Sequence, residues 1–380
     1  MQLKLTRSST SRDTMQALLE HADVRINGNR PWDIQVHDDR LYDRVLSQRS
    51  IGAGEAYMDG WWDCDSLDVF FDKVMRANLE EKFGMSWMHL WNMFRAKFLN
   101  QQRRNAAAKA AQAHYDIGND LFEAMLDERM VYSCGYWRRA RTLEEAQDAK
   151  LDLICRKLDL QPGMRLLDIG CGWGSLLEYA ASQYGVEGVG ITLAKEQAVL
   201  ARERCADWPV EIRVQDYRDL PSNVSFDRVA SIEMIEHVGL QNYETFIQIL
   251  KRSLTPDGLA LIQTSGRQGD GPSSDPWIVK YIFPGGSFPS AAEIAAAIGA
   301  HLTIEDWHTF GADFDPTLMA WARNVEAQWK TLPDRYDERF QRMWRYYLLQ
   351  CAGIFRSRHN NVWQIVLSPN GVPDGYRSLR

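Results

Sequence analysis

The chain has 380 residues, of which 45% are hydrophobic and 25% are charged, a balance typical of soluble globular proteins. Its net charge of −7 argues against non-specific binding to nucleic acid, which requires a basic surface. The six cysteines form no CxxC pair and no Cys/His spacing suited to zinc. The N-terminal residues lack the apolar core of a secretory signal. No apolar run approaches the roughly 20 residues of a membrane span. We therefore expect a cytoplasmic protein with reduced thiols and no metal site.

The first hundred residues end in a segment with the features of a membrane-surface helix. Over residues 82–104, tryptophans and phenylalanines recur at near-helical spacing among basic residues, with no acid. A helix that packs this apolar stripe against the rest of the protein is the alternative. The alanine-rich stretch that follows predicts a semi-rigid helical linker. We therefore expect a lipid- or membrane-interaction domain over 1–100, a helical linker over 101–113 and a catalytic domain over 114–380.

Downstream, short apolar runs alternate with segments of helical length. This alternation predicts βαβ units and an α/β fold, with a parallel sheet covered by helices on both faces. Residues 303–311 and 361–369 would add two more strands, with a long helix over 339–358 between them. Because such sheets bind ligands at the carboxyl ends of their strands, functional residues should follow the strands. The first five runs cover residues 165–170, 187–192, 210–216, 226–233 and 258–265.

A glycine-rich turn follows the first run, with Gly170, Gly172 and Gly174 in a GxGxG spacing before a helix. Glycines let the backbone approach a ligand, and the helix N-terminus offers free N–H groups. A nicotinamide site would place an acid at the tip of the next strand, but Thr192 and Leu193 stand there. The turn therefore favours a nucleoside-binding methyltransferase over a dehydrogenase. A turn that merely packs tightly is the alternative.

Six motifs stand in one order along the chain: HYDIGNDLFEAMLD (114–127), MVYSCGYW (130–137), LLDIGCGWGS (166–175), GITLAKEQ (190–197), IEHVG (235–239) and YIFPGGSFPS (281–290). Together they resemble the cyclopropane-fatty-acid synthases and mycolic-acid cyclopropane synthases. The resemblance implies a class I methyltransferase fold, doubly wound around a mostly parallel seven-stranded sheet, with a smaller N-terminal domain. It also implies S-adenosylmethionine as cofactor, bound by Tyr132, Ser133, Asp168, Gly170, Gly172, Thr192, Leu193, Gln197, Asp216 and Tyr217.

The same resemblance implies a polar floor beneath an apolar cavity. In the family, a bicarbonate ion removes a proton from the newly added methyl group, and residues matching Cys134 and Glu236 hold it. A histidine and a tyrosine complete the family's set, but this chain has Gln263 and Phe314 at those positions. It also has Glu233 where the family has glycine. We therefore hypothesise that the Glu233 carboxylate, its pKa raised by burial, replaces bicarbonate as base and cation stabiliser; bicarbonate itself is the alternative.

Purely structural roles for these residues are the alternatives. If the strand continues past Glu233, strand parity separates the two glutamates, and Glu233 would pair with Arg213 or Arg228 behind the sheet. A helical turn would instead bring the glutamates together. His237 is predicted to orient its neighbours rather than to act as a base. Cys134 as an inert buried thiol is the alternative to a site residue.

The resemblance further implies an unsaturated phospholipid in a membrane as substrate, a peripheral position at the inner face of that membrane, and a homodimer. A cyclopropane ring is the expected product, and a methylene- or methyl-branched chain is the alternative. A lipid-binding protein without catalysis is a third hypothesis, and the intact cofactor residues argue against it. Residues 269–290, rich in Gly, Pro and Ser, are predicted to form a mobile cover over the site.

Overall fold

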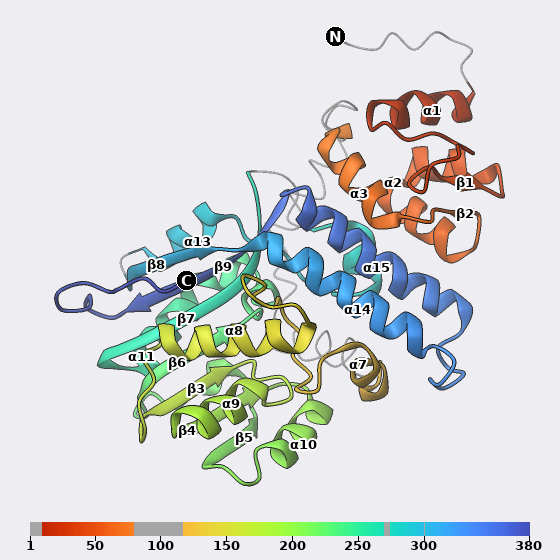
Figure 1. The fold of residues 1–380 in the computed structure, drawn as a ribbon. Coiled ribbons are helices and arrows are strands. Elements are labelled where there is room, and N and C mark those ends of the chain that lie inside the picture. The colour runs from red at the N-terminus through yellow and green to blue at the C-terminus, as the bar shows by residue number, and fades with distance from the viewer. Residues whose placement is uncertain (1–9, 80–116, 270–273, 300) are drawn as a thin grey trace. The chain divides into compact units, whose positions relative to one another are not determined.

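A computed structural model describes residues 10–79, 117–269, 274–299 and 301–380 (Figure 1). The predicted surface helix 82–104 and the predicted linker 101–113 lie outside these ranges. The chain forms two compact units, and no single cut in the sequence separates them. The first unit comprises Met1–Leu99, Ser274–Ile282 and Leu318–Asn360, and the second Asn100–Ser273, Phe283–Thr317 and Asn361–Arg380.

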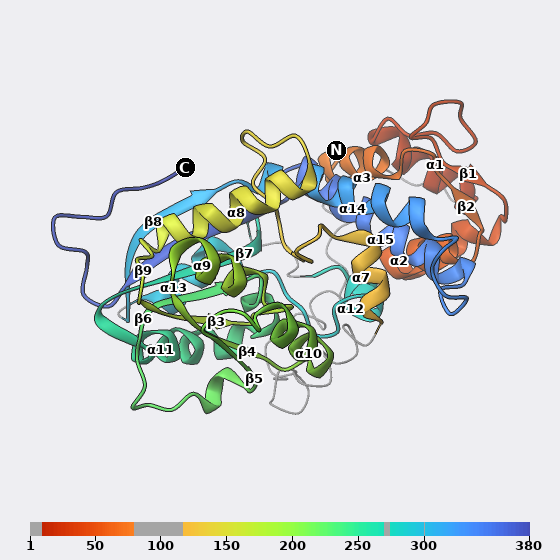
Figure 2. The same cartoon turned by 60° about the horizontal axis from the view of Figure 1, so that its bottom comes forward.

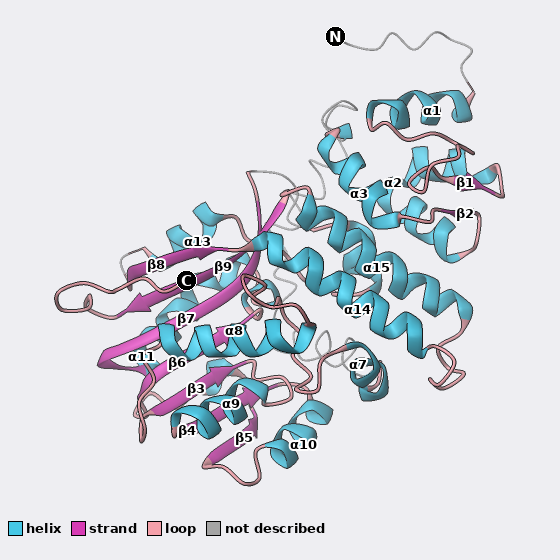
Figure 3. Ribbon diagram, viewed as in Figure 1, coloured by secondary structure: helices cyan, strands magenta, loops and turns pink. Residues whose placement is uncertain are grey.

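The second unit is built around a seven-stranded sheet (Figure 3). Its strands are β3 Arg165–Ile169, β4 Glu187–Thr192, β5 Val210–Val214, β6 Phe226–Ile232, β7 Leu254–Arg267, β8 Thr303–Thr309 and β9 Asn360–Ser368. Their order is β5-β4-β3-β6-β7-β9-β8. Neighbours from β5 to β7 are parallel, and β8 pairs antiparallel with β9. The predicted α/β fold is therefore confirmed, because every predicted run forms a strand of this mostly parallel sheet.

Helices cover both faces of the sheet, so the unit has two apolar cores (Figures 1 and 2). The covering helices are α8 Leu143–Lys157, α9 Ser175–Tyr184, α10 Lys195–Arg204, α11 Tyr243–Ser253 and α13 Ala291–Ile298, while α7 Asn119–Met125 contributes to neither core. Ile154 of α8, Leu177 of α9 and Ala201 of α10 belong to the core on one face. Leu250 of α11 and Ile294 of α13 belong to the core on the other. Strand residues alternate between these cores, as the two-residue period of a strand requires.

The first unit is mainly helical and has an aromatic core. Its elements are α1 Ser11–His21, β1 Gln35–Val36, α2 Arg40–Met58, β2 Trp62–Asp63, α3 Leu67–Arg76, α12 Pro276–Tyr281 and α15 Glu338–Arg356. The rings of Trp277 and Tyr346 are fully buried, with centroids 4.6 Å apart. A Cβ on Gly54 would come within 2.4 Å of the Trp277 ring, so only glycine lets α2 approach α12 this closely. Helix α15 is the long helix predicted over 339–358, and α14 Phe314–Gln328 contributes residues to both units.

Among the described residues, no helix is both long and apolar enough to cross a bilayer. Nor does this part of the chain bring three or more histidine, cysteine, aspartate or glutamate side chains together as metal ligands.

Candidate active site

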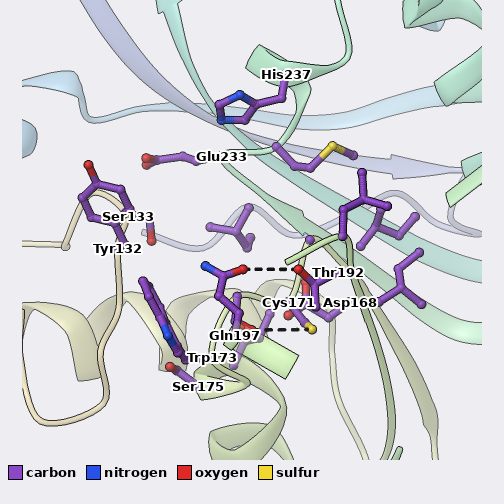
Figure 4. Close-up of a pocket in the computed structure, with 18 of the residues that line it drawn as sticks. Tyr132, Ser133, Asp168, Cys171, Trp173, Ser175, Thr192, Gln197, Glu233 and His237 are labelled. Atoms are coloured by element: carbon purple, nitrogen blue, oxygen red, sulfur yellow. Dashed lines mark hydrogen bonds between the residues drawn. The ribbon is translucent and has the colours of Figure 1, made fainter. Parts of the chain in front are cut away.

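A pocket lies at the carboxyl ends of β3, β4 and β6, where parallel sheets place their ligands (Figure 4). Residues 130–133, Lys150 of α8 and residues 283–285 complete its wall. The last of these ranges belongs to the predicted cover, of which residues 270–273 lie outside the described structure. The sequence-predicted residues that line the pocket are Tyr132, Ser133, Asp168, Gly170, Gly172, Thr192, Leu193, Gln197, Tyr217, Glu233 and His237.

The glycine-rich turn after β3 forms a cradle in this pocket. Gly170 and Gly172 have φ angles of +89° and +53°, which residues with a Cβ rarely adopt. A Cβ on Gly170 would lie 2.9 Å from the Met234 side chain. A Cβ on Gly172 would meet no atom within 4 Å and would occupy open space in the pocket wall. Helix α9 begins at Ser175, so its free N–H groups face the same region.

We expect Gly172→Leu to weaken cofactor binding more than about tenfold, because 1.4 kcal/mol of lost contact already corresponds to that factor. Gly163→Leu is a matched control. Gly163 also has a positive φ, +83°, and open space around its Cβ, but it lies outside the pocket. Both variants therefore suffer a similar backbone strain of about 1–2 kcal/mol. Calorimetric titration with S-adenosylhomocysteine should show lost affinity for Gly172→Leu alone, and equal affinities for the two variants would contradict the cradle.

The pocket is suited to a cationic ligand. Asp168 is 2% exposed, its Oδ1 atom finds no hydrogen-bond partner among the described residues, and burial raises its pKa to about 7. Such an oxygen is costly unless a ligand supplies a donor or a positive charge. Tyr132 and Trp173 add aromatic surface to the lining and pack on Phe122, with ring centroids 5.2 and 5.1 Å away. These features fit the ammonium and sulfonium groups of S-adenosylmethionine.

The tip of β4 offers polar groups for the rest of such a ligand. The Thr192 Oγ1 atom donates to Gln197 Oε1 at 3.2 Å, which leaves the amide nitrogen of Gln197 on the pocket side (Figure 4). Tyr217 also lines the pocket, in the short 3₁₀ helix η1 Tyr217–Asp219. Asp216 lies outside the lining, because its carboxylate caps η1 and forms an ion pair with Arg218 at 2.5 Å.

Glu233 follows directly after the last residue of β6 and has a φ of +50°. This left-handed residue ends the strand and directs the half-buried side chain into the pocket (Figure 4). Its Oε1 atom accepts two hydrogen bonds of 2.9 Å, from the backbone N–H of Cys134 and from Nε2 of Gln263. No hydrogen bond from the described residues reaches its Oε2 atom. Glu233 therefore presents one anchored and one available carboxylate oxygen.

The alternative of a salt bridge behind the sheet is wrong for Glu233. Arg213 forms an ion pair with Glu211, and Arg228 donates to the carbonyl oxygens of Leu158 and Asp227. The strand has ended before parity could separate the two glutamates, because the left-handed backbone and the helical turn after it redirect the chain.

Glu236 and His237 belong to that turn, the 3₁₀ helix η2 Ile235–His237. Oε1 of Glu236 accepts the backbone N–H of Ser265 at 2.6 Å. Burial, and then the nearby Glu233 carboxylate, raises the pKa of Glu236 to about 8. Burial lowers the pKa of His237 to about 4, so its ring is neutral near pH 7. The centroid of this ring lies 5.8 Å from that of the Phe283 ring.

The remaining predicted floor residues lie behind the pocket lining. Burial raises the pKa of the Cys134 thiol well above its ordinary value, so the contribution of Cys134 to Glu233 is its backbone N–H. Gln263 is fully buried on β7 and reaches the pocket through Glu233. Phe314 is buried at the start of α14 and is not among the lining residues.

Sequence reasoning missed Lys150. This residue is 1% exposed, lines the pocket and donates from Nζ to Ser133 Oγ at 2.9 Å. Burial lowers its pKa to about 8, while Glu233 is the largest influence that raises it. The signal in the sequence was a lysine at helical spacing from Ala146 and Ile154, on the buried stripe of α8, because a buried lysine needs a partner.

Comparison with known proteins assigns the chain to a family. A family model described as mycolic acid cyclopropane synthetase matches residues 101–365. The chain is 50% identical over 363 residues to the cyclopropane-fatty-acyl-phospholipid synthase of Escherichia coli strain K12, covering 96% of this chain and 94% of that protein. It is 37% identical over 283 residues to a protein of Pseudomonas putida named "Probable fatty acid methyltransferase", covering 72% of each.

A crystal structure of the mycolic acid cyclopropane synthase CmaA1 complexed with SAH and CTAB has a similar fold, with a TM-score of 0.63 and 31% identity over 68% of this chain and 97% of that chain. These matches confirm the resemblance found in the sequence, the class I methyltransferase fold and S-adenosylmethionine as cofactor. The chain belongs to the mycolic acid cyclopropane synthetase family of S-adenosylmethionine-dependent methyltransferases.

Proposed function

We propose that this enzyme converts the cis double bond of a phospholipid acyl chain into a cyclopropane ring, with Glu233 as the base. The observation that carries the proposal is a carboxylate in the wall of the cofactor pocket, held through one oxygen by Cys134 and Gln263. The family relationship and the 50% identity to a cyclopropane-fatty-acyl-phospholipid synthase support the substrate class.

Ring formation needs a base beside the reacting carbons. When bound, S-adenosylmethionine supplies an electrophilic methyl group, whose addition to the alkene leaves a carbocation on the acyl chain. Ring closure breaks one C–H bond of that methyl group, and its electron pair forms the new C–C bond. The proton passes to Oε2 of Glu233, while the anchored Oε1 holds the carboxylate in place. The negative charge of the carboxylate also stabilises the cation before closure.

The surroundings of the two glutamates affect their protonation differently. Burial raises the pKa of Glu233, but the hydrogen bonds from Cys134 and Gln263 and the charge of Lys150 lower it. Glu236 has a pKa of about 8 and is mostly protonated at pH 7. The hydrogen bonds from Cys134 and Gln263 favour the ionised form of Glu233, the residue that lines the pocket, so the two glutamates differ in how readily they hold a proton.

Bicarbonate does not fit this floor. Gln263, at the position of the family's histidine, already donates a hydrogen bond from its amide to the Glu233 carboxylate. Phe314, at the position of the family's tyrosine, has no hydroxyl group to donate. A bound bicarbonate would also lie beside the Glu233 carboxylate, and like charges in a buried site repel strongly. We therefore assign no step to bicarbonate.

A methyl- or methylene-branched product is the second candidate. If Glu233 does not take the methyl proton from the first cation, a hydride shifts from the methylated carbon to the cationic carbon. The shifted cation then loses a proton from the methyl group or from a chain carbon, which leaves a methylene- or methyl-branched alkene and no ring. The Gln263 and Phe314 departures and the similarity to a protein named as a fatty acid methyltransferase favour this candidate.

Proton NMR of the acyl chains tests the proposal. Purified protein is mixed with S-adenosylmethionine and vesicles of cis-monounsaturated phospholipid, and the chains are recovered. We expect upfield cyclopropyl protons. Vinylidene or branched-methyl signals would replace the proposal by the second candidate, and unchanged chains would overturn both. Vesicles of saturated phospholipid are the control, because they offer no double bond.

We propose that the enzyme works at a membrane surface, because its proposed substrate is a membrane phospholipid. We propose a cytoplasmic protein that binds peripherally to the inner face of the membrane through residues 1–100 and that acts as a homodimer, with residues 101–113 as linker and 114–380 as catalytic domain. The basic aromatic composition of residues 82–104 supports the first of these assignments, since it suits an anionic leaflet.

A further inference from the structure

A buried chain of two glutamine side chains ends at Glu233. Nε2 of Gln364, on β9, donates to Oε1 of Gln263 at 3.0 Å, and Nε2 of Gln263 donates to Oε1 of Glu233 at 2.9 Å. Both glutamines are fully buried. The backbone N–H of Glu233 also donates to the Gln263 carbonyl oxygen at 2.7 Å. Gln263 is therefore hydrogen-bonded to Glu233 through both its main chain and its side chain, while Gln364 is hydrogen-bonded to the side-chain amide of Gln263.

The donor-to-acceptor direction of these two hydrogen bonds follows from the chemistry of the Glu233 carboxylate, at which they end. An ionised carboxylate only accepts hydrogen bonds, whereas a carboxamide can present either its oxygen or its NH₂ group. The NH₂ group of Gln263 must face Glu233 when Glu233 is ionised, which turns its oxygen toward Gln364. The Gln364 donor meets that oxygen. A flipped Gln263 would place its oxygen against the carboxylate and its NH₂ group against the NH₂ group of Gln364.

Gln364 is not explained by stability. Its neighbours on β9, Trp363 and Ile365, are buried and apolar, and its own Oε1 atom has no hydrogen-bond partner among the described residues. An unpaired buried acceptor is destabilising, so the presence of Gln364 at this position calls for an explanation. The protein has a polar glutamine at position 364 although the carboxamide oxygen of that glutamine lacks a hydrogen-bond partner among the described residues.

We propose that Gln364 is a positioning residue that locks the Gln263 amide in the donor orientation and thereby keeps the Glu233 carboxylate ionised and aimed at the substrate. This inference rests on the proposed role of Glu233 as base. The titratable groups that interact with Glu233 are Lys150 from α8, Glu236 from η2 and the Cys134 thiol, and Tyr132, Asp168 and His237 line the same pocket. None of them is bonded to Gln364, so a change at Gln364 reaches Glu233 through Gln263.

The test is Gln364→Met, which keeps the length of the side chain and removes the donor. We expect the acid limb of the kcat–pH profile to move upward by about 0.5–1 pH unit, the size of a lost hydrogen bond of ordinary strength. At a fixed pH well down this acid limb kcat should fall about three- to tenfold, while KM for S-adenosylmethionine stays within about twofold, since Gln364 does not line the pocket. Gln364→Glu should be worse as pH rises, because its carboxylate would draw the Gln263 NH₂ group away from Glu233.

Ser368→Ala is the matched control. Ser368 is a buried polar residue at the C-terminal end of β9, bonded to Glu305, and its loss should leave the pH profile unchanged. Gln364→Met should also lower kcat no further in a Glu233→Gln background. An unshifted acid limb in Gln364→Met, with Glu233→Gln inactive, would overturn the positioning role alone. A fully active Glu233→Gln would instead overturn the proposed base. If Gln364→Met fails to fold, the near-isosteric Gln364→Glu decides by the direction of its pH dependence.

Discussion

Glu233→Gln is expected to lower cyclopropane formation by about 10²–10⁴-fold, the usual contribution of a general base. Glutamine keeps the shape of the side chain, and its oxygen still accepts from the Cys134 N–H and the Gln263 amide. It cannot accept the proton that ring closure releases. S-adenosylhomocysteine affinity should stay within about twofold, so the loss would appear in kcat rather than in binding. The measurement is ring formation per enzyme in vesicle assays, together with calorimetry.

The stability of this variant separates catalysis from folding. The pKa of Glu233 in the folded protein lies above its ordinary value of 4.5, so ionisation above that pH favours the unfolded chain. A neutral glutamine removes this cost, and we expect the Tm of Glu233→Gln at pH 7.5 to equal or exceed that of the unchanged protein. Glu187→Gln is the control for loss of a carboxylate elsewhere, because Glu187 is exposed and lies at the N-terminal end of β4, away from the pocket. Turnover close to that of the unchanged enzyme would remove Glu233 from the role of base.

Replacing Glu233 by glycine is expected to abolish ring formation and to make it recoverable by bicarbonate. Glycine vacates the space of the carboxylate and exposes the Cys134 N–H that held it. The φ of +50° at this position is one that glycine adopts without strain, so the backbone should tolerate the change. A triple variant with Glu233→Gly, Gln263→His and Phe314→Tyr restores the groups of the family's ion site. We expect it to recover more activity than Glu233→Gly alone at equal bicarbonate.

The assay compares bicarbonate-depleted buffer with buffer containing bicarbonate, at fixed pH and ionic strength, with chloride as the control anion. The unchanged enzyme should show no dependence on bicarbonate. Strict bicarbonate dependence of the unchanged enzyme would show that Glu233 does not substitute for the ion. Failure of bicarbonate to rescue either variant, with cofactor affinity intact, would show that the space beside Cys134 does not receive the ion.

Local patterns in the sequence are sufficient for the sheet and for the cofactor half of the site. The runs that form β3 to β9 are visible because buried strands are apolar and short, and because turns separate them. Gly170 and Gly172 are readable for a related reason, since a positive φ next to a ligand leaves few other residues possible. These features depend on residues near one another in the chain, so tertiary contacts do not need to be known.

The surroundings of Glu233 depend on contacts that no local pattern reveals. Its neighbours come from a loop about a hundred residues earlier and from β7, and the second glutamine comes from β9. The left-handed backbone at Glu233 ends β6 one residue earlier than the apolar run indicates, which is why strand parity could not decide its direction. Lys150 was overlooked because a lysine on a helix is usually solvated, and only the packing of α8 on the sheet buries it.

Residue types at short spacing are therefore enough to predict the α/β sheet, the glycine-rich turn, the family and an extra carboxylate at the end of β6. The contacts of that carboxylate, the choice of the oxygen that is held, and the line of Gln263 and Gln364 behind it are visible only in the folded protein. The reason is physical: hydrogen-bond direction and burial are set by side chains brought together from distant strands, and they exist only once the sheet has formed.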